Sequence, residues 1–297
     1  MRLNQPYQIC AVDGGGTGCR VAIACRDGTV AARATGGPAN VATDPEQAMR
    51  NVLDTVRRAA GALGLSAPAL RGMVAHVGLA GVLDAADAAF VAARLPFARC
   101  VVTDDRATSL AGALGPDDGA LLAIGTGSFI AIRRGGAARF LGGWGFALGD
   151  QASGAWLGRA LLEQVLLAHD GLAAHSALTA AVLAQFDGAP SCIVAFARAA
   201  QPSDHAAFAP RIVEAAAAGD AVALALMARG AAYLNGALAT AGLSAGEALC
   251  LTGGLGPHYA PLLAPEYRRA IRPALGAALD GALALAAATL HNGGPSA

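Results

Sequence analysis

The sequence predicts an α/β fold with two similar domains, and two patterns carry this prediction. Short apolar runs rich in β-branched residues alternate with longer segments of helical spacing, as in layered α/β proteins. One arrangement of strand, glycine turn and strand also occurs twice, in residues 7–25 and again in residues 120–133. A chain of 297 residues, 55% of them hydrophobic, is long enough to bury two cores of ordinary size.

The first half of the chain alternates strands with helices. Its best-marked helix begins after Asp44, a typical N-cap residue, with Pro45 in the first turn and Gly64 after the last. Apolar runs and glycine clusters predict the other elements. These are strands at 7–12, 19–25, 73–79 and 100–103, and helices at 85–94 and 106–114.

The second half is the more helical. The expected strands are 120–124, 129–133 and 249–252, and the expected helices are 156–168, 176–186, 210–218, 221–241 and 275–290. We expect an N-terminal domain of residues 1–115 and a C-terminal domain of residues 116–297, joined by a hinge because no low-complexity stretch separates them. Whether the terminal helix, about residues 275–291, packs back onto the first domain stays open.

Charge and composition exclude several classes of function. The formal net charge is zero and the sequence pI is about 7.0, so no electrostatic footprint for nucleic acid or an anionic membrane is present. All 21 basic residues are arginines, which excludes the lysine chemistry of P-loop NTPases and Schiff-base enzymes. The N-terminus lacks a signal-peptide core, and the apolar stretch 281–290 is too short to span a bilayer. We therefore expect a cytoplasmic protein that acts on a small molecule.

The first glycine turn follows an acidic residue. Asp13 ends an apolar strand, and the turn itself consists of Gly14, Gly15, Gly16 and Thr17. Glycine backbone can approach phosphate oxygens closely, and a carboxylate at the strand end can hold Mg²⁺ through water. An ordinary hairpin turn is the alternative for one such cluster taken alone.

Two further glycine turns repeat this pattern. Gly125, Thr126 and Gly127 follow one apolar strand, and Gly253 and Gly254 follow another. Three such turns in succession favour a phosphate-binding role over three unrelated hairpins.

The three turns resemble motifs of the actin/hsp70/hexokinase superfamily. DGGGT at 13–17 is similar to its first phosphate motif, AIGTGS at 123–128 to its second, and LTGGLG at 251–256 to its adenosine motif. The resemblance covers most of the chain. It implies two actin/hexokinase (ribonuclease H-like) domains around an ATP-binding cleft, with ATP and Mg²⁺ as cofactors.

One further segment narrows the resemblance to a branch. Residues 143–154 look like the GGWG and GDEGSG segment of the N-acetylglucosamine kinases, glucosamine kinases and BadF/BadG/BcrA/BcrD-type ATPases. Gln151 replaces the usual acid and Ala152 replaces a glycine. Asp150 with Gln151, and the later stretch 163–171, are similar to bacterial glucosamine kinases.

The acid that would accept the proton of the sugar hydroxyl follows the short strand 100–103. Asp104 matches the catalytic aspartate of the family, and we expect it to contact the sugar as its general base. Its neighbour Asp105 is expected to point the other way. In the alternative interpretation, both acids merely start the next helix as N-caps.

Four more residues are candidates for sugar binding. Asp150 would accept hydrogen bonds from sugar hydroxyls, and the resemblance places Asn40 and Gly143 at the sugar as well. Ser128 could also reach the sugar or simply cap its turn. A turn role is an equal alternative for Asn40.

The residue after the second phosphate turn bears on the acceptor. In the N-acetylglucosamine kinases that the chain resembles, an asparagine that touches the sugar follows this turn, whereas Phe129 stands here. We therefore expect an ATP-dependent kinase that phosphorylates the 6-hydroxyl of glucosamine, with N-acetylglucosamine as the alternative acceptor. If Phe129 faces the core, it carries no information on the acyl group.

Other classes are weighed against the kinase. An ATPase activator of the BadF/BcrA type would hold a [4Fe–4S] cluster through cysteines, and the six scattered cysteines offer no such set. A regulator of the ROK type would need a helix-turn-helix extension and a zinc cluster, and we expect neither. A homodimer stays open.

Overall fold

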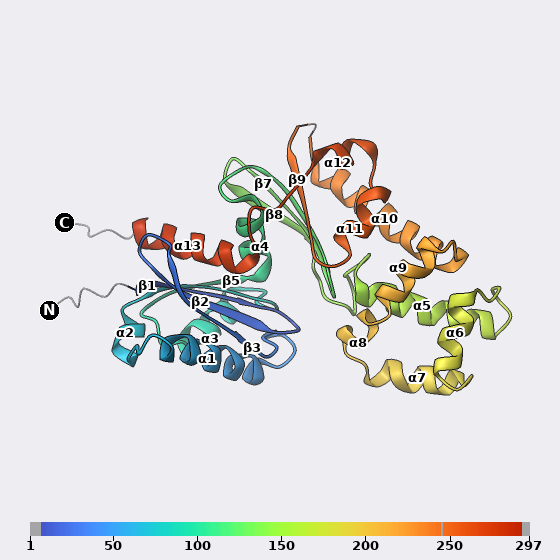
Figure 1. Ribbon diagram of the computed structural model, residues 1–297, viewed down its shortest axis with the longest axis horizontal. Coiled ribbons are helices and arrows are strands. Elements are labelled where there is room, and N and C mark those ends of the chain that lie inside the picture. The colour runs from blue at the N-terminus through green and yellow to red at the C-terminus, as the bar shows by residue number, and fades with distance from the viewer. Residues whose placement is uncertain (1–6, 245, 293–297) are drawn as a thin grey trace. The chain divides into compact units, whose positions relative to one another are not determined.

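The computed structural model describes residues 7–244 and 246–292 (Figure 1). The chain divides into two compact units. Unit 1 contains the residues up to Asp117 together with the C-terminal segment from Ala274, and unit 2 spans Asp118–Pro273. Each unit is built around one five-stranded sheet.

The sheet of unit 1 has the order β3-β2-β1-β4-β5. Its strands are β1 (Tyr7–Gly14), β2 (Cys19–Cys25), β3 (Val30–Gly36), β4 (Val74–Leu79) and β5 (Arg99–Asp104). The first three strands are antiparallel neighbours, while β4 and β5 run parallel to β1. Gly14 is level with Leu79, and Leu79 is level with Asp104. The three parallel strands therefore end at one edge of the sheet.

Alternate residues of β1 face two helical layers. Cys10 and Val12 pack in one core with Val52 of α1, whereas Ala11 packs with Ala282 of α13. The helices of this unit are α1 (Pro45–Gly61), α2 (Ala67–Arg71), α3 (Ala85–Arg94), α4 (Asp105–Leu114) and α13 (Ala278–Asn292). The terminal helix α13 thus completes the core of unit 1, although the chain between α4 and α13 forms unit 2.

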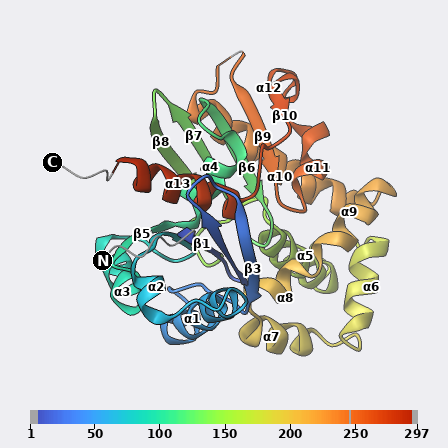
Figure 2. The ribbon, with the colours of Figure 1, turned by 60° about the vertical axis from the view of Figure 1, so that its left-hand side comes forward.

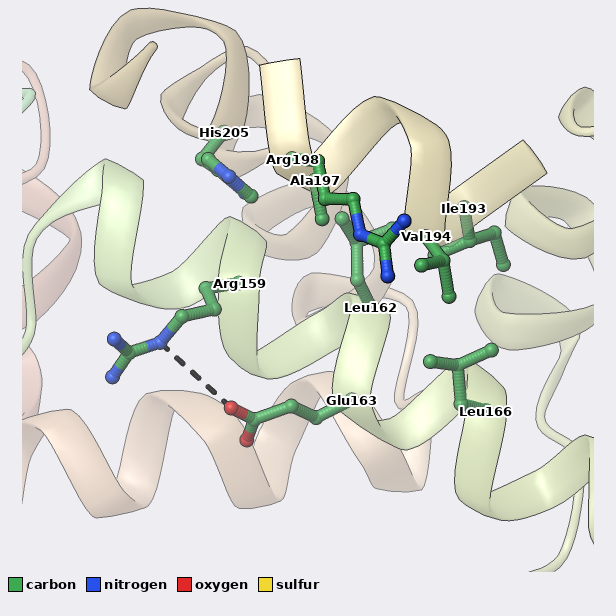
Figure 3. Close-up of a pocket in the computed structure, with 9 residues that line it drawn as sticks. All are labelled: Arg159, Leu162, Glu163, Leu166, Ile193, Val194, Ala197, Arg198 and His205. Carbon is green, nitrogen blue, oxygen red and sulfur yellow. Dashed lines mark ion pairs between the residues drawn. The ribbon is translucent and has the colours of Figure 1, made fainter. Parts of the chain in front are cut away.

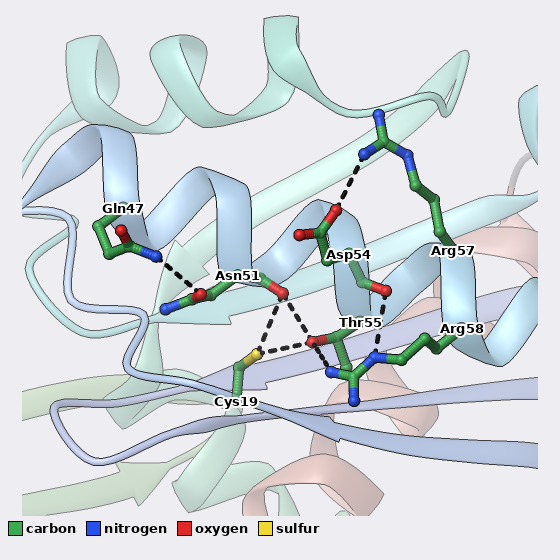
Figure 4. A network of polar contacts seen from close by, with 7 residues as sticks. All are labelled: Cys19, Gln47, Asn51, Asp54, Thr55, Arg57 and Arg58. Atoms are coloured by element: carbon green, nitrogen blue, oxygen red, sulfur yellow. Dashed lines mark hydrogen bonds and ion pairs between the residues drawn. The ribbon is translucent and has the colours of Figure 1, made fainter.

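A polar network ties α1 to the start of β2 (Figure 4). The Sγ atom of Cys19 lies 3.3 Å from Oγ1 of Thr55, and Thr55 donates its hydroxyl to the carbonyl of Asn51 at 2.6 Å. Arg58 donates to the carbonyl of Thr35 on β3. These contacts fix the strand that directly follows the first glycine turn.

The sheet of unit 2 has the order β10-β9-β6-β7-β8 (Figure 2). As in unit 1, the first three strands along the chain are antiparallel neighbours, and the two later strands run parallel to the first. Its strands are β6 (Gly119–Ile124), β7 (Ser128–Arg134), β8 (Ala137–Gly142), β9 (Ala248–Thr252) and β10 (Ile271–Arg272). Its helices are α5 (Gly154–His169), α6 (Ala177–Gln185), α7 (Pro190–Ala199), α8 (Pro202–Ala206), α9 (Ala209–Ala217), α10 (Ala221–Ala241), α11 (Gly256–Tyr259) and α12 (Pro265–Ala270), with a 3-10 turn at Ala260–Leu262.

Most of the expected elements are present, and the α/β prediction is confirmed. The helices α3 and α10 have the expected bounds, and Asp44 caps α1 by accepting the N–H of Gln47 at 2.9 Å. The strands β3 and β8, each the third strand of its sheet along the chain, were not expected from the sequence. Both β3 and β8 contain two adjacent alanines followed by one arginine, so side-chain pattern alone does not mark them as strands.

By length and composition alone, α10 would pass as a membrane span. Its residues Leu226, Leu234 and Leu238 are buried in the core of unit 2. An apolar core helix of a globular unit passes the same test.

Candidate active site

The first glycine turn lies at the edge where the parallel strands of unit 1 end. Asp13 is level with Arg20 on β2, and an ion pair of 3.0 Å joins their side chains. Burial raises the pKa of Asp13, and the charge of Arg20 opposes this shift. A buried carboxylate with one cationic partner at this edge can bind a hydrated cation.

The glycines of this turn serve two purposes. A Cβ atom on Gly14 would lie 2.5 Å from Cδ2 of Leu79 and 2.8 Å from Cβ of Ala39, so Gly14 is required for packing. A Cβ atom on Gly15 or Gly16 would meet nothing within 4 Å. The outer part of the turn therefore leaves open space next to backbone amides, as a phosphate site requires. The adjacent Thr17 is exposed.

Asp104 and Asp105 have different surroundings. Asp104 caps α4, because its Oδ1 accepts the N–H groups of Arg106 and Ala107 at 2.9 and 3.1 Å. Its Oδ2 accepts Nη2 and Nε of Arg106 at 2.7 and 3.1 Å. Both carboxylate oxygens are thus already engaged by donors of their own helix. Asp104 is therefore the N-cap residue of α4.

Asp105 has the properties of a general base. Burial, together with the negative charges of Asp104 and Asp13, raises its pKa to about 7, while the cation of Arg106 opposes the shift. A carboxyl group that titrates near neutral pH can accept a proton efficiently under physiological conditions. The sequence did not reveal this difference between two adjacent aspartates.

Asn40 is half-buried, and its side-chain oxygen is used locally. Oδ1 accepts the N–H groups of Ala42 and Thr43 at 3.0 and 3.3 Å, which forms an Asx turn. The turn is also tied to the strand edge, because Val41 donates its N–H to the carbonyl of Ala80 at 3.0 Å. Only the amide nitrogen of Asn40 would therefore serve a ligand, as a donor.

The second glycine turn, in unit 2, is held by the start of a helix. Gly125 donates its N–H to the carbonyl of Gly127 at 2.9 Å inside the turn. Gly154 and Ala155, in the first turn of α5, donate to the carbonyls of Gly125 and Thr126 at 2.8 and 3.1 Å. The turn therefore has a fixed shape, and a Cβ atom on Gly125 would meet nothing within 4 Å.

The third turn packs against the second. Gly253 has a φ of 82°, and a Cβ atom there would collide with the carbonyl oxygen of Ile124. Leu255 donates its N–H to the same carbonyl at 3.0 Å. Gly254 faces open space. The second and third turns thus form one rigid backbone surface within unit 2.

Asp150 lies directly behind the second turn. It has a φ of 58°, an unusual conformation for a residue other than glycine, and its Oδ2 would lie 2.9 Å from a Cβ atom on Gly127. Burial raises the pKa of Asp150, whereas hydrogen bonds from the amides of Ser128 and Gly145 oppose the shift. Strained backbone around a buried acid is typical of a functional site.

The remaining candidates of unit 2 surround this acid. The hydroxyl of Ser128 donates to the carbonyl of Gln151 at 2.6 Å, which favours its structural role. Gly143 and Gly145 have φ values of 72° and 83°, and Trp144 between them is 71% exposed. Trp144 is therefore not an anchor of the core of its own unit.

Tyr233 of α10 is a neighbour of Asp150 that the sequence did not reveal. Burial raises the pKa of Tyr233, and the charge of Asp150 adds to this effect. A Cβ atom on Gly142 would lie 3.1 Å from the Tyr233 hydroxyl. Helix periodicity alone does not distinguish such a residue from the other buried positions of α10.

The described residues fit a nucleotide and its cation. Gly15, Gly16 and Gly125 present backbone beside open space, and Asp13 supplies a carboxylate at the strand edge. Among residues 7–244 and 246–292, no three His, Cys, Asp or Glu side chains gather in a way that could hold a metal ion. Mg²⁺ is commonly bound by one or two carboxylates together with substrate phosphates and water, and Asp13 fits that pattern.

The fold and the glycine turns define a class, the two-unit α/β proteins of the actin/hexokinase type. Residues 11–281 match the model of the BadF/BadG/BcrA/BcrD ATPase family, and the chain belongs to that family. It is 35% identical over 286 residues to glucosamine kinase GspK of Vibrio cholerae serotype O1, covering 95% of this chain and 96% of that protein.

Solved structures agree with this assignment. A protein from Chromobacterium violaceum, provisionally named an N-acetylglucosamine kinase, superposes with a TM-score of 0.86 at 34% identity, over 95% of this chain and 99% of that one. A ROK family glucokinase from Streptomyces griseus, solved with glucose and AMPPNP, gives a TM-score of 0.58 at 19% identity over 97% of this chain and 100% of that one. The second likeness concerns the fold alone.

Proposed function

We propose that this protein is an ATP-dependent amino-sugar kinase that phosphorylates the 6-hydroxyl of glucosamine. One observation carries the proposal: the chain matches a glucosamine kinase at 35% identity over 95% of its length. We place this reaction in the cytoplasm. A homodimer is neither required nor excluded by this mechanism.

The glycine turns hold the nucleotide in this proposal. Gly15 and Gly125 leave room for the phosphate groups, and their own N–H groups are used inside the turns. The amides of Gly16 and Thr17 in the first turn, and of Thr126 and Gly127 in the second, donate to phosphate oxygens. Gly253 and Gly254 line the adenosine. Asp13 would hold Mg²⁺, and that cation would neutralise charge that develops on the transferred phosphoryl group.

The proton acceptor is assigned to Asp105 rather than to Asp104, which the sequence pattern had favoured. Four donors already engage the oxygens of Asp104, and this supports a positioning role at the start of α4. The pKa of Asp105, near 7, suits the removal of a proton from a hydroxyl as the oxygen attacks the phosphoryl group. The negative charge of Asp13 contributes to this pKa.

Asp150 and Asn40 are proposed to bind the acceptor. The carboxylate of Asp150 would accept hydrogen bonds from the sugar, and it also favours the cationic ammonium group of glucosamine. Asn40 would donate through its free amide nitrogen, and Gly143 would contact the sugar through its backbone. Ser128 keeps a structural role in this proposal, because its hydroxyl donates to the carbonyl of Gln151.

N-acetylglucosamine is the second candidate acceptor. The similarity to the Chromobacterium violaceum protein, at 34% identity, is the observation that favours it. Phe129 on β7 is half-buried, so its position does not exclude an acyl group nearby.

A panel of three hexoses tests the proposal. The full chain is incubated with MgATP and glucosamine, N-acetylglucosamine or glucose, and the products are identified by NMR and mass spectrometry. We expect the highest kcat/KM for glucosamine and a phosphate on its 6-oxygen. A higher kcat/KM for N-acetylglucosamine overturns the choice of acceptor, and the absence of ATP-dependent product from both amino sugars overturns the kinase.

A further inference from the structure

A cavity of about 250 Å³ lies between α5 and α7 in unit 2. Its walls are mostly apolar and consist of Leu162, Leu166, Ile193, Val194 and Ala197. Charged and polar groups line the rest of it, namely Arg159, Glu163, Arg198 and His205 (Figure 3). None of these residues belongs to the glycine turns or to the acids described above.

Two polar atoms at this cavity lack hydrogen-bond partners within the described structure. His205 is only 3% exposed, and its buried Nδ1 has no partner. Phe146 and Phe196 fix its ring, with centroid distances of 4.8 and 5.5 Å. The Nε of Arg159 is also buried without a hydrogen bond, although it lies 3.7 Å from Oε1 of Glu163. Such buried groups are uncommon unless a ligand or water completes them.

The charge of the cavity selects the kind of ligand. Two arginines stand against one glutamate, so the lining is net positive, and an arginine fork matches a carboxylate. The unpartnered Nδ1 of His205 can donate a hydrogen bond to a carboxylate oxygen, and burial lowers the pKa of this ring. The apolar walls disfavour a hydroxyl-rich, cationic amino sugar.

We propose that this cavity binds a small amphiphilic monocarboxylate, with its chain against α5 and α7 and its carboxylate between Arg198 and His205. The volume suits a molecule of roughly ten non-hydrogen atoms. The cavity adjoins the middle turns of α5, whereas the first turn of this helix holds the second glycine turn. It is therefore a site separate from the proposed nucleotide and sugar contacts.

Calorimetric titration of the full chain with octanoate tests the proposal, with octanol as the uncharged comparison. We expect saturable binding of one octanoate with a Kd of about 0.1–1 mM, and at least about tenfold weaker binding of octanol. Ala197→Phe, which fills the cavity from an exposed position, and Arg198→Met, which removes the cation, should each weaken octanoate binding about tenfold or more.

The control is Ala195→Phe, an equally exposed substitution on α7 that does not line the cavity. It should leave the Kd unchanged, and melting temperatures establish that all variants are folded. The proposal is overturned by non-saturable octanoate heats, by octanol binding as tight as that of octanoate, or by a wild-type Kd in both cavity variants.

Discussion

The two glycine hairpins share a pattern but differ in how each obtains its acid. In unit 1, Asp13 stands in the strand before the turn and pairs with Arg20. In unit 2, the strand before the turn ends in the fully buried Ile124, and Asp150 reaches the turn from behind. The duplicated backbone therefore carries a cation-binding acid in one copy and a sugar-binding acid in the other, according to our proposal.

The turns also differ in their support. Gly14 fixes the first turn by close packing against Leu79 and Ala39, whereas a Cβ atom on Gly15 or Gly16 would meet nothing within 4 Å. The second turn accepts hydrogen bonds from α5 and packs against Gly253. Substitutions can separate these roles.

The largest effect is expected for Asp13→Asn. The neutral amide cannot replace the charge that holds Mg²⁺, and Arg20 loses its partner, so kcat/KM should fall by about 10³-fold. Steady-state kinetics at saturating Mg²⁺ measure this. The matched control is Asp27→Asn in the exposed β2–β3 turn, which should retain full activity. If kcat/KM of the Asp13→Asn enzyme lies within a few-fold of the wild-type value, Asp13 does not hold the metal ion.

Replacing Asp105 or Asp104 by asparagine is expected to give the next largest effect. Asp105→Asn should lower kcat by about 10²-fold or more, because the proton acceptor is lost. Asp104→Asn should lower stability by about 1 kcal/mol through the weakened cap, with a smaller effect on kcat. The wild-type kcat/KM should rise as the pH passes through about 7, and this rise should vanish in Asp105→Asn. If Asp104→Asn lowers kcat more than Asp105→Asn does, the general base is Asp104.

Stability gives a second readout for Asp105. Folding raises its pKa from 3.8 to about 7, so the folded state binds more protons than the unfolded chain between these values. Stability from this group is therefore full below the lower value and is lost as the pH rises toward 7. Asp105→Asn abolishes that loss. Its melting temperature relative to wild type should be higher at pH 8 than at pH 4.

Glycine substitutions distinguish packing from ligand contact. Gly15→Val meets open space in the protein, so it should fold normally yet weaken MgATP binding about tenfold or more. Gly253→Ala would collide with the Ile124 carbonyl and should destabilise unit 2 by about 2–4 kcal/mol. Equilibrium nucleotide titration and chemical denaturation separate the two. Normal ATP affinity in a folded Gly15→Val protein would contradict the phosphate role of the first turn.

The smallest effect is expected for Asp150→Asn. The amide keeps the shape but loses the charge, so KM for glucosamine should rise about tenfold, and KM for N-acetylglucosamine less. Both KM values are measured at one pH. Equal changes for the two sugars would show that Asp150 does not select the amino group.

Much of the fold followed from local sequence. Glycine turns, the Asp44 cap and strand or helix periods depend on neighbouring residues, and β1, β2, α3 and α10 lie where these signals placed them. The edge strand β8 carries no such signal, because its first three residues, two alanines and one arginine, have no strong preference for a sheet. Its pairing with β7 is decided by the tertiary structure.

The sequence by itself determined that an acid follows β5 and that three glycine turns follow apolar strands. It could not decide between Asp104 and Asp105, because helix capping and burial depend on how α4 starts against the sheet. Nor could it place Tyr233 beside Asp150 or predict the cavity between α5 and α7, because segments from different parts of the chain form both environments. Local backbone preferences are encoded in short windows, whereas desolvation and side-chain partners arise only when distant elements pack.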